Sequence, residues 1–173
     1  DKFLKSVNHF VNNMNVSIIN IKKRNINFHA RFSAKQRIYK YVIFNRLSKP
    51  AIEKRRGWHI IKELDISLMK KGAKKLLGTN DFSTFRSSSC SAKSSIRTMK
   101  SIKIKSIRGR IEIQFKSQSF LQQQVRSMVG CLKYLGEKKW NLKHFKKSLF
   151  SKKRSMCAPP APACGLYLYK VKY

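Results

Sequence analysis

The spacing of apolar and polar positions along the chain predicts strands that alternate with single helices. The clearest strand pattern covers residues 37–44, where apolar and aromatic side chains dominate. Further strands are predicted over residues 16–21, 99–107, 111–115 and 166–173, and helices over residues 3–12, 66–77, 121–135 and 140–150. Asp65 is expected to cap the second helix and Gly78 to end it, while Arg108-Gly109-Arg110 turns a hairpin. This order predicts an α+β fold with a mostly antiparallel sheet and helices packed on one face.

One predicted helix raises a question of charge. Along residues 121–135 one helical face collects only apolar side chains, namely Leu121, Val125, Met128, Leu132 and Leu135. Arg126 lies away from that face, in a segment that continues without charge through Leu132. A solvated arginine is one interpretation. If the helix is buried all round, the guanidinium needs a carboxylate partner, because an unpaired buried charge is costly.

The charge balance makes such a partner scarce. The 173 residues contain 40 Lys and Arg against 7 Asp and Glu, a formal net charge of +33. This excess indicates a polyanionic partner, and nucleic acid fits better than a membrane. The sequence has neither an apolar run of about 18 residues nor a signal-peptide core at its start.

The four cysteines favour a reducing compartment. Cys90, Cys131, Cys157 and Cys164 form no CxxC pair, and no histidine lies at zinc-finger spacing from them. We therefore expect free thiols in the cytoplasm and no metal site, with a metal or a disulfide as the alternative.

Two segments contain candidate chemistry, each with a structural alternative. Tyr39 reads as a half-buried strand aromatic or as a ring that stacks on a nucleobase, with Arg31, Arg37 and Lys40 on phosphates. Asp81, in Gly78-Thr79-Asn80-Asp81-Phe82, is expected to be a structural turn residue.

Together these segments resemble one family. The stretches FHARFSA, RIYKY, LLGTNDFSTFR, FLQQQVRSMVG and APACGLYL occur in the order and spacing of the tRNA pseudouridine synthase A (TruA) family. The resemblance runs from about Val7 to Tyr173, nearly the whole chain. It implies a pseudouridine-synthase-like fold and an isomerase, homodimeric and without cofactor, that converts uridine to pseudouridine at positions 38–40 of the tRNA anticodon stem-loop.

The resemblance also assigns roles to individual residues. Tyr39 matches the tyrosine beside the target base, and Arg126 matches the arginine that pairs with the catalytic aspartate. The residues that match apolar or RNA-facing positions of the family are Leu166, Leu168, Arg31 and Arg86.

The sequence departs from the family at the aspartate. The family carries it in a Gly-Arg-Thr-Asp-x-Gly-Val motif, and neither Asp1, Asp65 nor Asp81 has those neighbours. We therefore expect residues 1–27 to be the tail end of the family's N-terminal catalytic half and residues 28–173 its C-terminal domain. The chain alone is then expected to be inactive. A basic RNA-binding module and a purely structural or dimerising half remain the alternatives.

Overall fold

A computed structural model describes residues 2–173, so that Asp1 lies outside the described residues. The chain forms two compact units, one ending at Ser33 and one covering Ala34–Tyr173. The boundary predicted after residue 27 rests on the family resemblance and not on compactness, so these units do not test it and it stays a prediction.

The first unit consists of helix α1 (Lys2–Phe10) and an extended segment. The strand predicted over residues 16–21 does not form; that prediction was wrong. A strand needs a neighbour for its backbone groups, and here the side chain of Asn8 takes that place. Its Nδ2 donates to the Ile18 carbonyl and its Oδ1 accepts from the Ile18 N–H, both at 2.8 Å. Large apolar side chains of this unit, such as Phe10, Ile19 and Ile26, are exposed.

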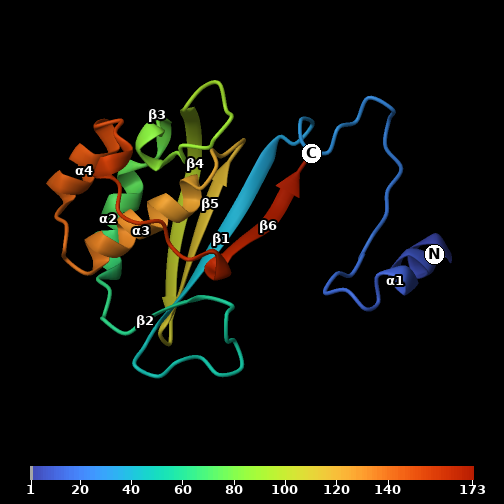
Figure 1. The fold of residues 1–173 in the computed structure, drawn as a ribbon, viewed down its shortest axis with the longest axis horizontal. Helices are drawn as coiled ribbons and strands as arrows, with labels where there is room; N and C mark the ends of the chain where they lie inside the picture. Colours follow the sequence, from blue (N-terminus) through green and yellow to red (C-terminus); the bar gives the residue numbers. More distant parts are fainter. Residues whose placement is uncertain (1) are drawn as a thin grey trace. The chain divides into compact units, whose positions relative to one another are not determined.

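The second unit is built on a six-stranded sheet (Figure 1). The strands are β1 (Gln36–Asn45), β2 (Trp58–Ile60), β3 (Gly78–Asp81), β4 (Ile96–Ile107), β5 (Arg110–Ser117) and β6 (Leu166–Lys172). Their order is β2-β1-β5-β4-β3, with β6 also paired to β1. Only the β1–β2 pair is parallel. The predicted α+β class with a mostly antiparallel sheet is confirmed.

Strand β1 is central because both of its edges are occupied. Along one edge β5 pairs with it from Arg37 to Phe44. Along the other edge β6 covers Gln36 to Tyr41, and β2 takes over from Ile43 to Asn45. The chain's last strand is therefore fixed beside the first half of β1, which contains Tyr39.

The predicted hairpin joins β4 to β5 where expected. Its two turn residues, Arg108 and Gly109, both have positive φ, at 48° and 74°. Such a turn matches the right-handed twist of two antiparallel strands. The longer strands β4 and β5 extend the predicted ones by a few residues at their outer ends.

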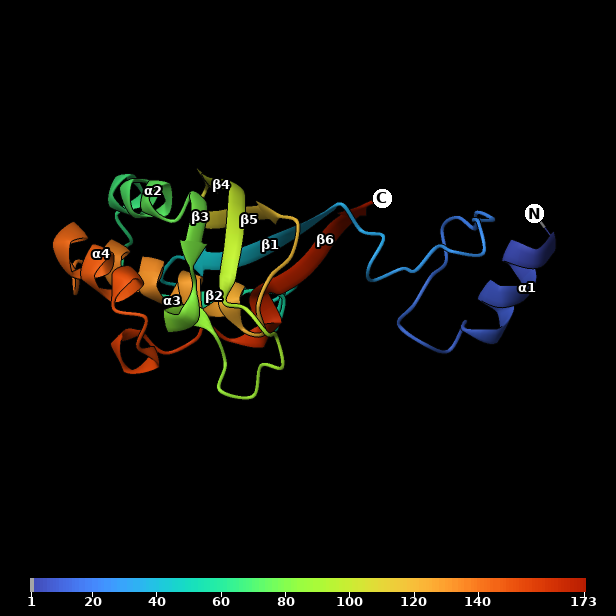
Figure 2. The same cartoon turned by 90° about the horizontal axis from the view of Figure 1, so that it is seen from above.

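Helices α2 (Ile66–Lys75), α3 (Gln124–Gly136) and α4 (Leu142–Phe150) cover one face of the sheet (Figure 2). The core between them contains Tyr41, Ile43, Ile111, Ile113, Phe115, Met69, Met128, Leu132 and Phe145. Asp65 caps α2 as predicted, since its Oδ1 accepts from the Leu68 N–H at 2.8 Å. Helix α3 begins at Gln124 rather than at residue 121, because Gln123 has a left-handed φ of 61°.

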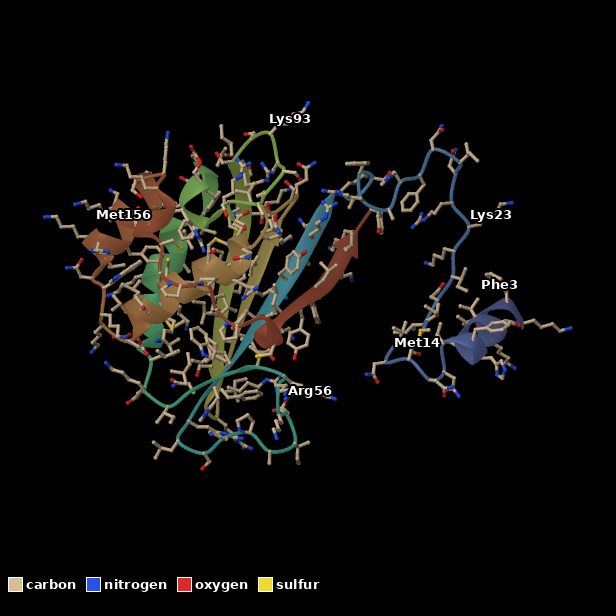
Figure 3. All side chains as sticks on the ribbon, viewed as in Figure 1. Phe3, Met14, Lys23, Arg56, Lys93 and Met156 are labelled. Carbon is tan, nitrogen blue, oxygen red and sulfur yellow. The ribbon has the colours of Figure 1, made fainter. Side chains whose placement is uncertain are left out.

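Two short strands, β2 and β3, were missed by the sequence analysis. Strand β3 pairs with β4 from Gly78 to Asp81, in a segment expected to be only a helix stop and a turn. The serine-rich loop that follows, residues 87–95, contains Lys93, which is labelled in Figure 3, and is held at both ends. The Ser87 N–H donates to the Gln122 carbonyl at 3.1 Å, and the Ser95 hydroxyl donates to Asp81 at 2.7 Å.

Within residues 2–173 no helix is long and apolar enough to cross a membrane.

Candidate active-site surface

Tyr39 lies on the helix-covered face of the sheet, beyond the part that the helices bury. Strand residues alternate between faces, so Tyr39 shares this face with the core residues Tyr41 and Ile43. Its ring is half-buried and meets Phe120 edge to face, with ring centroids 5.1 Å apart and an interplanar angle of 88°. An aromatic pair at the margin of a core offers an exposed ring surface to a ligand.

Strand β6 places two leucines beside this ring. Leu168 pairs with Tyr39 across the β1–β6 ladder, and Leu166 pairs with Tyr41. Residues directly opposite in an antiparallel pair point to the same face. Leu166 packs against the core, whereas Leu168 is 56% exposed. Tyr39, Phe120 and Leu168 thus form an apolar surface at the end of the core.

Arg126 lies in the first turn of α3 and is half-buried. Its Nε donates to the Ala161 carbonyl at 2.6 Å, and the Ala161 N–H donates back to the Arg126 carbonyl at 3.0 Å. Among the described residues, no Asp or Glu carboxylate lies within 4.0 Å of its guanidinium. The partner found in this chain is a backbone carbonyl, and no carboxylate of residues 2–173 takes up the charge.

The segment that holds Arg126 is residues 158–162, here called the proline strap. Ala158 and Ala161 are buried, and the strap runs against α3. Gly130, one turn after Arg126, lets it come close, since a Cβ at Gly130 would lie 2.1 Å from the Pro159 carbonyl oxygen. From the sheet side, the Tyr41 hydroxyl donates to the Pro162 carbonyl at 2.7 Å.

The predicted phosphate contacts on β1 divide between the two faces of the sheet. Arg37 lies on the face of Tyr39, and its Nη1 donates to the Gln118 carbonyl at 2.5 Å. Lys40 lies on the opposite face, where its Nζ is 3.1 Å from Glu112 and 4.5 Å from the centroid of the Tyr169 ring. The structure therefore does not bring Lys40 together with Tyr39.

The other two predicted RNA contacts are Arg86, in the second unit, and Arg31, in the first. The Nη2 of Arg86 donates to the Cys90 carbonyl at 2.6 Å, so this side chain closes the start of the serine-rich loop. Arg31 belongs to the first unit, where its guanidinium lies over the Phe32 ring at 5.7 Å.

The carboxylates on which the question of Arg126 depends are engaged in structural bonds. Asp65 is the cap of α2. Asp81 accepts from the Ser83 hydroxyl and then from the Ser95 hydroxyl, and these bonds lower its pKa to about 2. The prediction that Asp81 is structural is confirmed.

Two site residues escaped the sequence analysis. Tyr41 follows Tyr39 by two positions, and the period-two rule alone puts both on one face. Phe120 opens the quoted stretch FLQQQVRSMVG, but its contact with Tyr39 crosses from the end of β5 to β1 and leaves no local pattern. The signal for Tyr41 was present, and the signal for Phe120 was not.

The remaining polar and sulfur groups give no metal centre. Across residues 2–173, no three His, Cys, Asp or Glu side chains are grouped so as to hold a metal ion. The Sγ atoms of Cys131 and Cys157 lie 3.5 Å apart as thiols beneath the proline strap. Cys131 is buried and Cys157 is half-buried, so the two thiols belong to the packing between α3 and the chain before the strap.

Comparison with known proteins points to one family. The family model described as tRNA pseudouridine synthase matches residues 73–173. The tRNA pseudouridine synthase A of Pelagibacter ubique is 73% identical over all 173 residues, which cover 70% of that relative. The enzymes of the same name from Rhodospirillum centenum and Caulobacter vibrioides are 37% and 41% identical, with 71% and 64% of their lengths covered. The chain thus spans about two thirds of the length of its relatives.

Proposed function

Because the chain belongs to the tRNA pseudouridine synthase A family, we propose that it forms the tyrosine- and arginine-bearing side of an active site that isomerises uridine to pseudouridine in the tRNA anticodon stem-loop, at positions 38–40. One observation carries the proposal. The half-buried guanidinium of Arg126 is held by the Ala161 carbonyl and is near enough to Tyr41 to act on the pKa of its hydroxyl, and no carboxylate among residues 2–173 lies within 4.0 Å of it.

The reaction explains why a carboxylate belongs beside Arg126. Making pseudouridine breaks the N1–C1′ glycosidic bond, turns the base, and joins C5 to C1′. A carboxylate must act at the sugar, as nucleophile or as base on C2′. A neighbouring arginine keeps that carboxylate ionised by lowering its pKa, and its planar fork also fixes the orientation. We propose that a segment outside residues 2–173 supplies this group.

The apolar surface suits the base itself. A uridine in a stem-loop must leave its stack before its glycosidic bond can be attacked, and the flipped base needs aromatic and apolar walls. Tyr39, with Phe120 behind it, and Leu168 supply such walls from neighbouring elements. Arg37 lies on the same face as Tyr39, and we propose that it contacts the RNA backbone; Lys40, Arg86 and Arg31 are proposed as further RNA contacts.

Charge supplies the affinity for RNA in this proposal. With +33 formal charges, phosphate contacts dominate binding and carry little sequence information. The proposal also retains the homodimer that the family resemblance implies and the cytoplasmic location that the cysteine pattern favours. A basic RNA-binding module would share the charge, yet it has no need of a guanidinium held at the margin of an apolar surface.

A chimera tests the proposal. Residues 2–173 replace the matched region of the Pelagibacter ubique relative, and tritium release from tRNA labelled at uridine C5 measures turnover. We expect an active chimera and no turnover from the chain of residues 1–173 alone. Tyr39→Ala should abolish turnover in the chimera with tRNA affinity nearly intact, because the ring contacts the base and not the phosphates. Turnover by residues 1–173 alone would refute the proposed external carboxylate.

A matched variant separates the site from the core. Tyr134→Ala removes a half-buried tyrosine from the far end of α3, where its ring packs on Trp140 at 5.4 Å. It should lower stability and leave turnover by the folded chimera unchanged. An active Tyr39→Ala chimera would return Tyr39 to the interpretation of a core-margin aromatic.

A further inference from the structure

Two neighbouring carbonyls of the proline strap are held from two different elements. Arg126 on α3 donates from Nε to the Ala161 carbonyl at 2.6 Å, and Tyr41 on β1 donates from its hydroxyl to the Pro162 carbonyl at 2.7 Å. The strap thus accepts a hydrogen bond from each of the two side chains. Whatever displaces the Pro162 carbonyl displaces the acceptor on which the Arg126 side chain rests.

The strap is fixed on its other sides by close backbone contacts. The Ala161 N–H bonds to the Arg126 carbonyl at 3.0 Å, and the Ala158 N–H lies 3.4 Å from the Cys131 sulfur. Beyond the strap, Gly165 crosses the Tyr41 ring so closely that a Cβ there would lie 2.8 Å from its Cζ. Tyr41 therefore contacts the strap region through both its hydroxyl and its ring.

The Tyr41 hydroxyl is suited to remain a donor. The side chain is fully buried in the core. Burial raises the pKa of Tyr41 well above its ordinary value, and this outweighs the opposing effect of Arg126. The phenol is therefore protonated throughout any working pH, and its proton is always available to the Pro162 carbonyl.

We propose that Tyr41 is a positioning residue, which fixes the proline strap so that the Arg126 guanidinium is held in one orientation for its carboxylate partner. The inference rests on the proposed function for the identity of that partner. An arginine side chain has many rotamers and loses about 2 kcal/mol of rotamer entropy when fixed. With Nε occupied by Ala161, the Nη edge remains for a bidentate carboxylate, whose geometry is demanding.

The first test needs no activity. In the chain of residues 1–173, hydrogen exchange of the Arg126 Nε–H, followed by ¹⁵N NMR, reports the bond to Ala161. We expect Tyr41→Phe to accelerate this exchange at least about tenfold. The matched control is Tyr167→Phe, because the Tyr167 hydroxyl makes a comparable bond of 2.6 Å to the Arg56 carbonyl on the other face of the sheet. That variant should leave the Arg126 exchange unchanged.

The second test is kinetic and uses the chimera described above. Tyr41→Phe should lower kcat about tenfold and change KM less than about twofold, because charge and RNA contacts are untouched. Tyr167→Phe should alter neither constant. If Tyr41→Phe fails to fold, 4-aminophenylalanine at position 41 replaces it; this keeps a weaker donor and should give intermediate exchange and intermediate kcat.

The two tests separate the two claims. Unchanged Arg126 exchange in Tyr41→Phe, or equal effects of Tyr41→Phe and Tyr167→Phe, would overturn the positioning role. Accelerated exchange together with an inactive parent chimera would overturn the proposed function and leave the positioning of Arg126 standing.

Discussion

Arg110 and Arg126 are two half-exposed arginines that the same acid-poor chain treats in opposite ways. Arg110, at the start of β5, bonds to Glu53 and to Glu112, and its pKa is raised first by the bond to Glu53. Two of the seven acidic residues are therefore concentrated on one arginine. The Arg126 side chain, in contrast, has a backbone carbonyl and no carboxylate as its hydrogen-bond acceptor among the described residues.

The difference follows from what each arginine connects. Arg110 connects the hairpin end of β5 to the loop that carries Glu53, on the face of the sheet that the helices leave open. Its guanidinium carbon also lies over the Phe44 ring, 5.7 Å from the ring centroid. Arg126 joins α3 to the proline strap at the margin of the core. The carboxylates at Arg110 stabilise a loop, whereas the Arg126 guanidinium is, in our proposal, the partner of a carboxylate from outside residues 2–173.

The largest expected effect is the loss of tRNA affinity with rising salt concentration, and it shows whether either arginine is a major phosphate contact. If about 6–10 phosphates are contacted, affinity of the chain for tRNA should fall roughly 10³–10⁵-fold between about 50 and 200 mM salt. Neither Arg110→Ala nor Arg126→Ala should reduce the slope of log affinity against log salt by more than about 1. Filter binding over a salt series measures both. A flat salt dependence would contradict the argument from charge.

The next effect sharpens the contrast in function. In the chimera, Arg126→Ala leaves the incoming carboxylate unpaired, which typically costs about 3–5 kcal/mol. Turnover should therefore fall roughly 10²–10⁴-fold, since about 1.4 kcal/mol is tenfold in rate. Arg126→Lys should rescue poorly, because a point charge lacks the planar fork. Arg110→Ala is the control and should keep turnover within about threefold. Similar losses for both arginines would remove the distinction.

A third prediction concerns Asp81, since the contrast would break if this carboxylate could approach Arg126. Its pKa is lowered to about 2 by the Ser83 and Ser95 hydroxyls. A carboxylate with a lowered folded pKa stabilises the fold above its unfolded pKa, and this stability is lost as pH falls through the folded pKa. Solvent screening at this partly exposed site reduces the effect, so Asp81→Asn should cost about 1 kcal/mol at pH 7, and the cost should disappear between about pH 4 and pH 2.

Denaturant titrations over that pH range measure the Asp81 effect. Asp65→Asn is the control, because asparagine is as good an N-cap as aspartate. If Asp81→Asn has no effect on stability at any pH, Asp81 is not tied to its serines and becomes available as a candidate catalytic group.

The same contrast shows what the sequence could and could not predict. Arg126 was singled out by its place in an apolar helix, and the period-two pattern of β1 correctly gave the strand that carries Tyr39. The Ala161 carbonyl could not be predicted, because it comes from a proline-rich loop 35 residues away with no period of its own. Lys40 was grouped with Tyr39 by proximity in sequence, although adjacent strand residues face opposite sides. The strand over residues 16–21 failed because no sequence pattern reveals whether a partner strand exists.

The smallest expected effect compares the two arginines by stability alone, in the chain of residues 1–173. Arg110→Ala and Arg126→Ala should each cost about 1 kcal/mol at pH 7, the former by losing two partly exposed ion pairs and the latter by losing one donor to a buried carbonyl. Burial raises the pKa of Glu112, but Lys40 and Arg110 outweigh this and lower it. The Arg110 contribution is therefore present above the unfolded pKa of glutamate and is lost as pH falls through the lowered one. The Arg126 side chain donates to a carbonyl, which does not titrate, so its contribution to the free energy of unfolding should persist from pH 7 to pH 3.

Urea titrations of both variants at pH 7 and pH 3 measure the difference between the two arginines. A loss of the Arg126 effect at pH 3 would mean that a carboxylate of this chain already pairs with Arg126.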